Sequence, residues 1–367
     1  MNQLIRLLAC ATQGGGGNDD ARLRDLLLPF NTRFIHLDRS KKFAAGYEIL
    51  RCLRSHQFSL FVMEGSGVAV GISAIVAKLL FGARYIVSSG DAIAPFLSAR
   101  HAFGAPIFKL YERLLYANCS GFIGWTPYLV GRALTLGATR GITVPGWAPY
   151  TMAPSTLADA RRAIRSRFGI PPEAVVYGIV GSLNWSGRFN YCYGSELVRA
   201  AVRKASRAYV IVVGDGSGLQ HLQKIAGSAL NKTIFLTGRV EREEVPAYMA
   251  AMDVGCIPQS VDGVGNFRYT TKISEYQAFG LPFITTQIPM SYDLDHGNLW
   301  RLPGKYPWGE PFLEALANLM VTLTHDDIGR RKASHPDPSQ TFDRETQMQR
   351  MTAFLQDVLD ERTKATS

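Results

Sequence analysis

The residues with the clearest chemical use lie in the segment from Lys272 to Pro282. Glu275 falls on the first turns of a predicted helix. Ala278 and Gly280 leave little side-chain bulk on the surface of that helix. The N–H groups and the dipole at a helix start favour phosphates, and a carboxylate accepts hydrogen bonds from a sugar diol. The segment suits a ligand with phosphates and hydroxyls. An ordinary amphipathic helix, with Glu275 solvated or paired with Lys272, would show the same pattern.

A run of glycines follows the first predicted strand and comprises Gly14, Gly15, Gly16 and Gly17. Glycine allows tight turns and close approach of the backbone to a ligand, and its N–H groups can face an anion. The run lacks the full Gly-x-Gly-x-x-Gly dinucleotide pattern, because Asp19 occupies the third glycine position. It is a candidate ligand loop, with a flexible surface loop as the alternative.

Short loops after other predicted strands carry further candidates. Gly181 permits a tight turn, and Arg188 downstream could contact a phosphate through two hydrogen bonds, with a solvated arginine as the alternative. Gly214 follows a second strand of the same half, and the pair Arg239 and Val240 follows a third. Each loop is a weak indication by itself, because glycine commonly ends strands.

An acidic residue follows a strand of the first half. Asp91 could orient a sugar hydroxyl or act in proton transfer, and a helix N-cap is the alternative. Asp293 and Asp295 resemble an Asp-x-Asp metal motif but lie in a late loop, away from the other candidates. We therefore predict no metal and no cofactor.

Charge is distributed unevenly along the 367 residues, whose net charge is +10. Residues 1–173 hold 20 Lys and Arg and 10 Asp and Glu, so the first half carries all of the excess (20 − 10 = +10). This half could meet anionic lipid or an acidic substrate, or simply have a soluble basic surface. Nucleic acid is not expected, because there is no recognised nucleic-acid module or long Lys/Arg run.

The five cysteines and the apolar stretches point to a cytoplasmic protein. Scattered single cysteines favour neither a zinc site nor a disulfide framework. Leu7 to Cys10 resembles a lipoprotein cleavage box, but the apolar region before it is too short, and a core strand is expected instead. Gly65 to Phe81 is too short for a confident membrane span, and we expect a buried helix there.

Apolar runs of strand length alternate with helical patterns, which is typical of an α/β fold with parallel sheets. The expected strands are 4–11, 32–37, 59–63, 84–88 and 120–124, then 175–180, 208–213, 233–237, 254–257 and 283–285. The expected helices include 43–55, 107–117, 194–204, 218–226, 245–252, 271–279 and 343–362. The predicted domains are residues 1–150 and 174–340, with a proline-rich linker at 151–173 and a C-terminal helix and tail at 341–367.

The second half carries a series of short motifs in a fixed order. They are Val180-Gly181 with Arg188 downstream, Val212–Gly216, Phe235–Val240, Val245–Val254, Lys272–Tyr276 and Gly280-Leu281-Pro282. In order and spacing the series resembles the retaining family-4 glycosyltransferases over about residues 174–290. The first half of the chain resembles them only in its general succession of strands and helices. The resemblance implies the GT-B fold, in which two Rossmann-like domains face each other across an interdomain cleft.

The resemblance also implies a nucleotide-sugar donor, UDP- or GDP-linked, held by the second domain. The implied donor site comprises Gly181, Arg188, Gly214, Arg239, Val240, Thr270, Thr271, Lys272 and Glu275. Glu275 would bind the ribose hydroxyls, and the backbone of Thr270 and Thr271 would meet the diphosphate. Arg188 would neutralise that diphosphate, and Arg239 and Val240 would border the base. Asp91 and Arg188 are the candidate catalytic residues, and the acceptor would lie near Gly14 to Gly17.

The expected activity is a retaining, metal-independent hexosyl transfer to a glycan or lipid-linked acceptor in the synthesis of a cell-surface polysaccharide. The protein would be cytoplasmic and could associate with the anionic inner face of the membrane. Three departures from the family pattern are visible. Phe267 replaces the first of two glutamates, Ser182 stands where many members carry an arginine, and Gly90-Asp91 falls where a histidine is common. An inactive homologue that binds a partner and a nucleotide-sugar epimerase are the alternatives.

Overall fold

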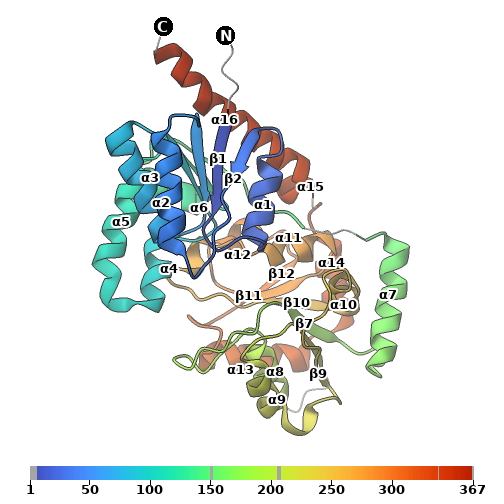
Figure 1. The fold of residues 1–367 in the computed structure, drawn as a ribbon. Coiled ribbons are helices and arrows are strands. Elements are labelled where there is room, and N and C mark those ends of the chain that lie inside the picture. Colours follow the sequence, from blue (N-terminus) through green and yellow to red (C-terminus); the bar gives the residue numbers. More distant parts are fainter. Residues whose placement is uncertain (1–5, 149–151, 205–207, 338, 366–367) are drawn as a thin grey trace. The chain divides into compact units, whose positions relative to one another are not determined.

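The structure is a computed structural model, in which residues 6–148, 152–204, 208–337 and 339–365 are described (Figure 1). The chain divides into two compact units. The first comprises Met1–Gly146, Phe267–Tyr269 and Phe342–Ser367, and the second comprises Trp147–Asn266 and Thr270–Thr341. Each unit is built on its own parallel sheet and its own apolar core.

The sheet of the first unit has six parallel strands in the order β2-β1-β3-β4-β5-β6. They are β1 (Arg6–Ala11), β2 (Asn31–Phe34), β3 (Leu60–Glu64), β4 (Tyr85–Ser89), β5 (Gly121–Gly124) and β6 (Gly141–Thr143). The central strands are buried along their whole length, which explains why they appear in the sequence as short continuous apolar runs. The five strands predicted for this half are present, and β6 is an addition of three half-buried residues.

Helices cover both faces of this sheet (Figure 1). They are α1 (Asn18–Leu26), α2 (Lys42–Arg54), α3 (Val68–Phe81), α4 (Ile93–Arg100), the 3-10 turn η1 (Ala102–Gly104), α5 (Ala105–Ala117), α6 (Pro127–Thr135) and α16 (Arg344–Ala365). Helices α2, α3 and α5 pack side by side, while α1 packs against α16. The helix predicted within residues 65–81 is α3. The terminal helix α16 belongs to the first unit, although it follows the second in the sequence.

The sheet of the second unit has six parallel strands in the order β12-β11-β10-β7-β8-β9. They are β7 (Val176–Val180), β8 (Tyr209–Val213), β9 (Ile234–Leu236), β10 (Val254–Ile257), β11 (Phe283–Thr286) and β12 (Leu299–Leu302). Five of these were predicted, and β12 was not. The strand order makes this, like the first, a doubly wound Rossmann-like sheet, so the predicted fold class of two such α/β units is confirmed.

The helices of the second unit are α7 (Pro154–Arg167), α8 (Ser195–Arg203), α9 (Leu219–Ala226), α10 (Val245–Ala251), α11 (Thr271–Ala278), α12 (Met290–Asp293), α13 (Glu310–Thr322), α14 (His325–Ala333) and α15 (Ser339–Phe342), with short turns η2 (Gly227–Ala229) and η3 (Gly265–Phe267). Helix α7 lies within the predicted linker 151–173, yet it packs against α10. That stretch is therefore largely part of the second unit. No helix in the described part of the chain is long and apolar enough to cross a membrane.

Candidate functional site

A pocket of about 190 Å³ opens at the carboxyl ends of β7 and β10 in the second unit, next to the start of α11. It is lined by Ile179, Val180, Gly181, Ser182, Tyr193, Cys256, Ile257, Pro258, Gln259, Thr270, Thr271 and Lys272. Doubly wound sheets bind ligands at this edge. The structure thus brings together four residues predicted for the donor site, namely Gly181, Thr270, Thr271 and Lys272.

The start of α11 gives this pocket an anion-binding character. Thr270 is the N-cap residue of the eight-residue helix, with extended φ and ψ. Its Oγ1 atom is buried and has no hydrogen-bond partner among the described residues. The first N–H groups of a helix have no partner within the helix, and its dipole favours a negative charge there. A bound phosphate or hydroxyl could satisfy both Thr270 and this first turn.

Lys272 and Glu275 form an ion pair at the pocket wall. Lys272 Nζ lies 3.1 Å from each carboxylate oxygen of Glu275, and the Glu275 residue is only 4% exposed. Lys272 is the one charged residue in the lining of this pocket. The pair therefore places a cation at the surface of the pocket and the predicted carboxylate directly behind it.

Gly214 shapes this edge of the sheet without lining the pocket. Its φ is +141°, and a Cβ atom there would lie 1.8 Å from the carbonyl oxygen of Gly181. Its N–H group donates to the carbonyl oxygen of Gly238 at 3.1 Å. The two loops that follow β7 and β8 can approach so closely only because residue 214 has no side chain.

Three other predicted donor residues lie outside the pocket. Arg188 is exposed, with its guanidinium 5.2 Å from the ring centre of Phe189. Arg239 is exposed and Val240 half-buried after β9, and neither lines the pocket. The structure does not bring Arg188 together with Glu275, so Lys272 is the better-placed cation for a phosphate.

Tyr193 and Gln259 line the pocket and were not predicted. Gln259 Nε2 donates to the Tyr193 hydroxyl at 3.2 Å, and Gln259 is almost fully buried. Gln259 could have been found, because it follows β10 at the same sheet edge as the other candidates. Tyr193 has no comparable signal in the sequence.

A buried acid lies behind the pocket. Glu196, on the first turn of α8, accepts a hydrogen bond from the N–H of Gly194 at 3.2 Å. Burial raises the pKa of Glu196 to about 7. Its carboxylate also raises the pKa of the neighbouring Cys256 thiol, which burial already shifts upward. Since Cys256 lines the pocket, Glu196 lies directly behind the pocket wall.

The glycine run of the first unit forms a turn rather than an open anion site. The N–H groups of Gly14, Gly15 and Gly16 donate to Ala11 O, Leu37 O and the Asp20 carboxylate. A Cβ atom on Gly15 would lie 2.1 Å from the His36 ring. Gly17 is the N-cap residue of α1. Three of the four N–H groups are therefore already used, and the acceptor role of the run stays a prediction.

Asp91 is paired within the first unit. Arg268 Nε donates to Asp91 Oδ1 at 2.5 Å, and Arg268 belongs to the short segment 267–269 that this unit includes. In the same segment the Phe267 carbonyl accepts from Thr126 Oγ1 at 2.9 Å, and Arg132 lies over the Phe267 ring. The carboxylate of Asp91 is thus already neutralised, and its catalytic role also stays a prediction.

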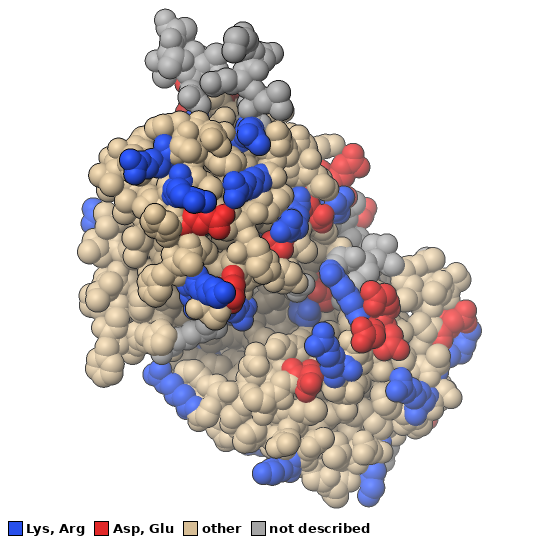
Figure 2. Space-filling model, viewed as in Figure 1, with Lys and Arg blue, Asp and Glu red and all other residues tan. Residues whose placement is uncertain are grey.

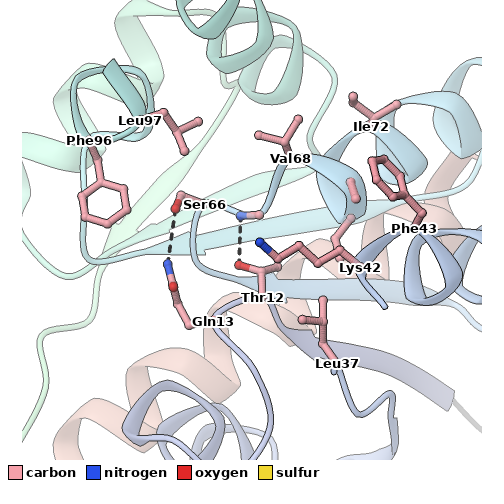
Figure 3. A pocket seen from close by; sticks show the side chains of 13 residues that line it. Thr12, Gln13, Leu37, Lys42, Phe43, Ser66, Val68, Ile72, Phe96 and Leu97 are labelled. Carbon is pink, nitrogen blue, oxygen red and sulfur yellow. Dashed lines mark hydrogen bonds between the residues drawn. The ribbon is translucent and has the colours of Figure 1, made fainter. Parts of the chain in front are cut away.

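The first unit has a pocket of its own, of about 280 Å³, beside the glycine run (Figure 3). Its lining is mostly apolar, and it comprises Thr12, Gln13, Leu37, Lys42, Phe43, Ser66, Gly67, Val68, Ala69, Val70, Ile72, Phe96 and Leu97. Gln13 Nε2 donates to Ser66 Oγ at 3.4 Å, and the Gly67 N–H donates to Thr12 Oγ1 at 3.0 Å. The pocket therefore combines a small polar patch with apolar walls and one cation, Lys42.

A buried network lies under the carboxyl edge of this first sheet. Arg22 Nη1 contacts Glu64 Oε2 at 2.8 Å, and Ser88 Oγ and Trp125 Nε1 donate to the same carboxylate. Arg22 Nη2 also donates to the Val144 carbonyl at 2.6 Å. Burial lowers the pKa of Arg22 and raises that of Glu64. The network joins α1 to the ends of four strands, and no local pattern in the sequence indicated it.

Possible metal ligands among the described residues are scattered. Within the described ranges, no group of three or more His, Cys, Asp or Glu side chains is placed to hold a metal ion. Asp295 instead pairs with Arg301. Metal independence stays a prediction.

Residues 174–322 match the family described as glycosyl transferases group 1. This range includes every residue that lines the pocket at the start of α11. A 2-deoxystreptamine glucosyltransferase from Streptomyces kanamyceticus is 27% identical over 199 residues, which is 52% of this chain and 50% of that protein. The match thus spans about half the length of that relative.

Solved structures extend the likeness in fold to both units. Alr3699/HepE from Anabaena, solved with UDP-glucose, matches with a TM-score of 0.71 at 16% identity, over 96% of this chain and 100% of that chain. The lipopolysaccharide outer core galactosyltransferase WaaB, in its apo form, matches with a TM-score of 0.59 at 12% identity, over 95% and 99%.

The fold and the site together define the class of protein. The two doubly wound units have the GT-B fold, as predicted from the sequence motifs. The match to the group-1 glycosyltransferase family lies largely within the second unit, whereas the likeness in fold covers both units.

Proposed function

We propose that this protein is a glycosyltransferase whose second unit binds a nucleotide-sugar donor in the pocket at the start of α11. The observation that carries the proposal is the meeting of Thr270, Thr271 and Lys272 at the carboxyl edge of the sheet, within the residues that match the family. A helix start with a buried, unpartnered hydroxyl and one cation suits the diphosphate of such a donor.

The donor residues take separate roles in this proposal. The first turn of α11 and Lys272 bind the diphosphate and stabilise the charge that grows on it as the sugar leaves. Glu275 accepts hydrogen bonds from the ribose hydroxyls once Lys272 has turned toward the phosphates. Transfer proceeds with retention and without a metal. A UDP-linked donor is favoured over a GDP-linked one, because a similar fold has been solved with UDP-glucose.

The acceptor in this proposal is a glycan or lipid-linked molecule bound by the first unit, in the synthesis of a cell-surface polysaccharide. The apolar pocket beside Thr12 and Lys42 supports an amphiphilic acceptor. The excess of positive charge in residues 1–173 supports contact with the anionic inner face of the membrane. The protein is then a cytoplasmic enzyme that works at that surface.

Calorimetric titration of UDP, GDP and ADP tests the donor site. We expect UDP to bind the wild type, and Glu275→Ala to weaken binding by about tenfold or more, because a charge-assisted hydrogen bond contributes roughly 1.5–3 kcal/mol. Glu243→Ala removes an exposed carboxylate of the same unit and should leave the affinity unchanged. Turnover of a UDP-sugar with an acceptor, followed by NMR of the anomeric centre, then tests transfer and retention.

A protein without catalysis is the second candidate, because Phe267 occupies the position of the family's first glutamate and packs under Arg132. Absence of binding of any of the three nucleotides to the wild type would favour this partner-binding role. Donor turnover without an acceptor would instead indicate an epimerase.

A further inference from the structure

Large apolar side chains gather on one side of the first unit. Most of those that the described residues leave exposed lie on α2, α3, η1 and α5, and they are Phe43, Tyr47, Ile72, Leu79, Leu80, Phe103, Ile107, Leu110 and Leu114. Helices α2, α3 and α5 lie next to one another (Figure 1). We call this surface the apolar face. An exposed apolar surface of this extent marks an interaction site more often than a free surface.

The exposed apolar residues of α5 are spaced regularly along the helix. Ile107, Leu110 and Leu114 are separated by three and four residues, so they form one stripe along the helix. Tyr111 and Leu115, on the adjoining side of the same helix, are buried in the core of the unit. Helix α5 therefore has a second apolar side that its own unit does not cover.

The charge beside this stripe has one sign. Lys109 and Arg113 are exposed on α5, and Lys78 is the only charged residue of α3. The single acid of α3 and α5 is Glu112, which is 1% exposed and pairs with Arg132 at 2.5 Å. In Figure 2 the surface over α3 and α5 is accordingly tan and blue.

We propose that the apolar face docks on an anionic lipid bilayer, with α3 and α5 lying in the plane of the headgroups. Exposed leucines, isoleucine and phenylalanine would enter the boundary between headgroups and acyl chains, and Lys78, Lys109 and Arg113 would contact lipid phosphates. The exposed charges of α5, Lys109 and Arg113, are both positive and complement an anionic bilayer. The one acid of α2, Glu48, is partly exposed and pairs with Arg33. This inference rests on the proposed function. It deepens that proposal by naming the surface that contacts the membrane.

The pocket of the first unit adjoins the apolar face. Phe43 and Ile72 belong to the face and also line the pocket, at the right of the view, while Lys42, Thr12 and Gln13 lie nearer its middle (Figure 3). An acceptor anchored in the docked bilayer would reach the pocket with its apolar part toward Phe43 and Ile72. Its anionic or hydroxylated part would lie toward Lys42 and Thr12.

Co-sedimentation with vesicles of phosphatidylcholine and phosphatidylglycerol tests the docking. We expect the wild type to bind these vesicles at low salt and Leu79→Glu/Leu110→Glu to bind about tenfold less or worse, because each change removes an apolar anchor and adds a repelled charge. Leu28→Glu is the matched control. Leu28 is 65% exposed, close to the 68% of Leu79, but it lies just after α1, away from the apolar face.

The basic side chains give a second, separable readout. Lys109→Glu/Arg113→Glu should also lose binding to anionic vesicles by about tenfold or more, while Lys224→Glu in the second unit should not. Binding of the wild type should weaken as salt is raised and be weak on pure phosphatidylcholine. Circular dichroism and unchanged UDP affinity establish that each variant is folded.

Three results would overturn the inference: no vesicle binding by the wild type at low salt, equal loss in Leu28→Glu, or full binding by both double variants. A change in oligomeric state of Leu79→Glu/Leu110→Glu on gel filtration would show that a second copy covers the face instead. UDP titration and transfer to a water-soluble acceptor need no vesicles. They therefore report on the proposed function even where docking fails.

Discussion

Lys272 carries the first prediction at the scale of single residues. It is the one charged residue in the lining of the pocket at the start of α11, and its ammonium lies 3.1 Å from the Glu275 carboxylate. Lys272→Met should weaken UDP binding by about tenfold or more, because the diphosphate loses a charge-assisted contact worth roughly 1.5–3 kcal/mol. Titration calorimetry measures this. Lys224→Met, which removes an exposed lysine of the same unit, is the control, and an unchanged affinity in Lys272→Met would place the diphosphate elsewhere.

The buried carboxyl group of Glu196 should make the free energy of unfolding depend on pH. Its folded pKa of about 7 is above its unfolded value of 4.5, so its contribution to stability is complete below about pH 4.5 and is lost as pH rises through 7. The total loss is about 3 kcal/mol, at 1.36 kcal/mol for each pKa unit. Glu196→Gln, which cannot ionise, should show a flatter profile of unfolding free energy between pH 5 and 8 in urea titrations. Parallel profiles for the variant and the wild type would contradict the assignment.

The sequence marked Gly181 by its place after a strand, whereas Thr270 and Thr271 came from the family resemblance. All three line one pocket, and their roles stay a prediction. Arg188 was chosen by its distance along the chain from Gly181. The path of a loop of several residues cannot be derived from spacing, and the structure leaves this arginine exposed. Tyr193 and the pair of Arg22 with Glu64 depend on contacts between distant segments, which no local pattern encodes.

Helix α7 carries a prediction at the scale of elements. Asp253 is almost fully buried and accepts hydrogen bonds from Arg161, Arg165 and the N–H of Val176, at 2.6, 2.6 and 2.9 Å. Asp253→Ala should destabilise the second unit by about 3–5 kcal/mol, because it leaves the buried Arg165 without its carboxylate partner. Chemical denaturation measures the change.

The same helix supplies the control for that variant. Asp159 pairs with Arg162 on the exposed side of α7, and both side chains are 72% exposed. Asp159→Ala should change the free energy of unfolding by no more than about 1 kcal/mol. Equal effects of the two substitutions would show that burial does not decide the strength of these pairs.

Most elements were predictable because buried strands and helix starts leave strong local signals. The strands β3, β4, β7 and β8 are continuous apolar runs bounded by glycine or polar residues. The sequence missed β6 and β12, which are short and lie at the edges of their sheets, where the pattern is weaker. It also assigned α7 to a linker because prolines flank it, although Pro154 merely begins the helix.

At the scale of the whole molecule, the sequence did not show where α16 packs. Met351, Leu355 and Val358 are buried, and Arg84 of the first unit donates to the Val358 carbonyl, 274 residues away along the chain. Proximity in sequence would have placed this helix on the second unit. Its membership of the first depends on apolar contacts across that long separation. The expected cleft between the two domains stays a prediction.

The division into two units with separate cores gives the last prediction. Calorimetric unfolding should show two transitions, because each core can melt by itself. UDP at about 100 times its Kd should stabilise the second unit by about 2.7 kcal/mol and raise only its transition. Leu355→Ala should lower only the transition of the first unit, since truncation of a buried leucine destabilises by roughly 2–5 kcal/mol. Val321→Ala, at an exposed position of α13, is the control that should move neither transition. A single transition, displaced as a whole by both UDP and Leu355→Ala, would mean that the two cores unfold as one cooperative body.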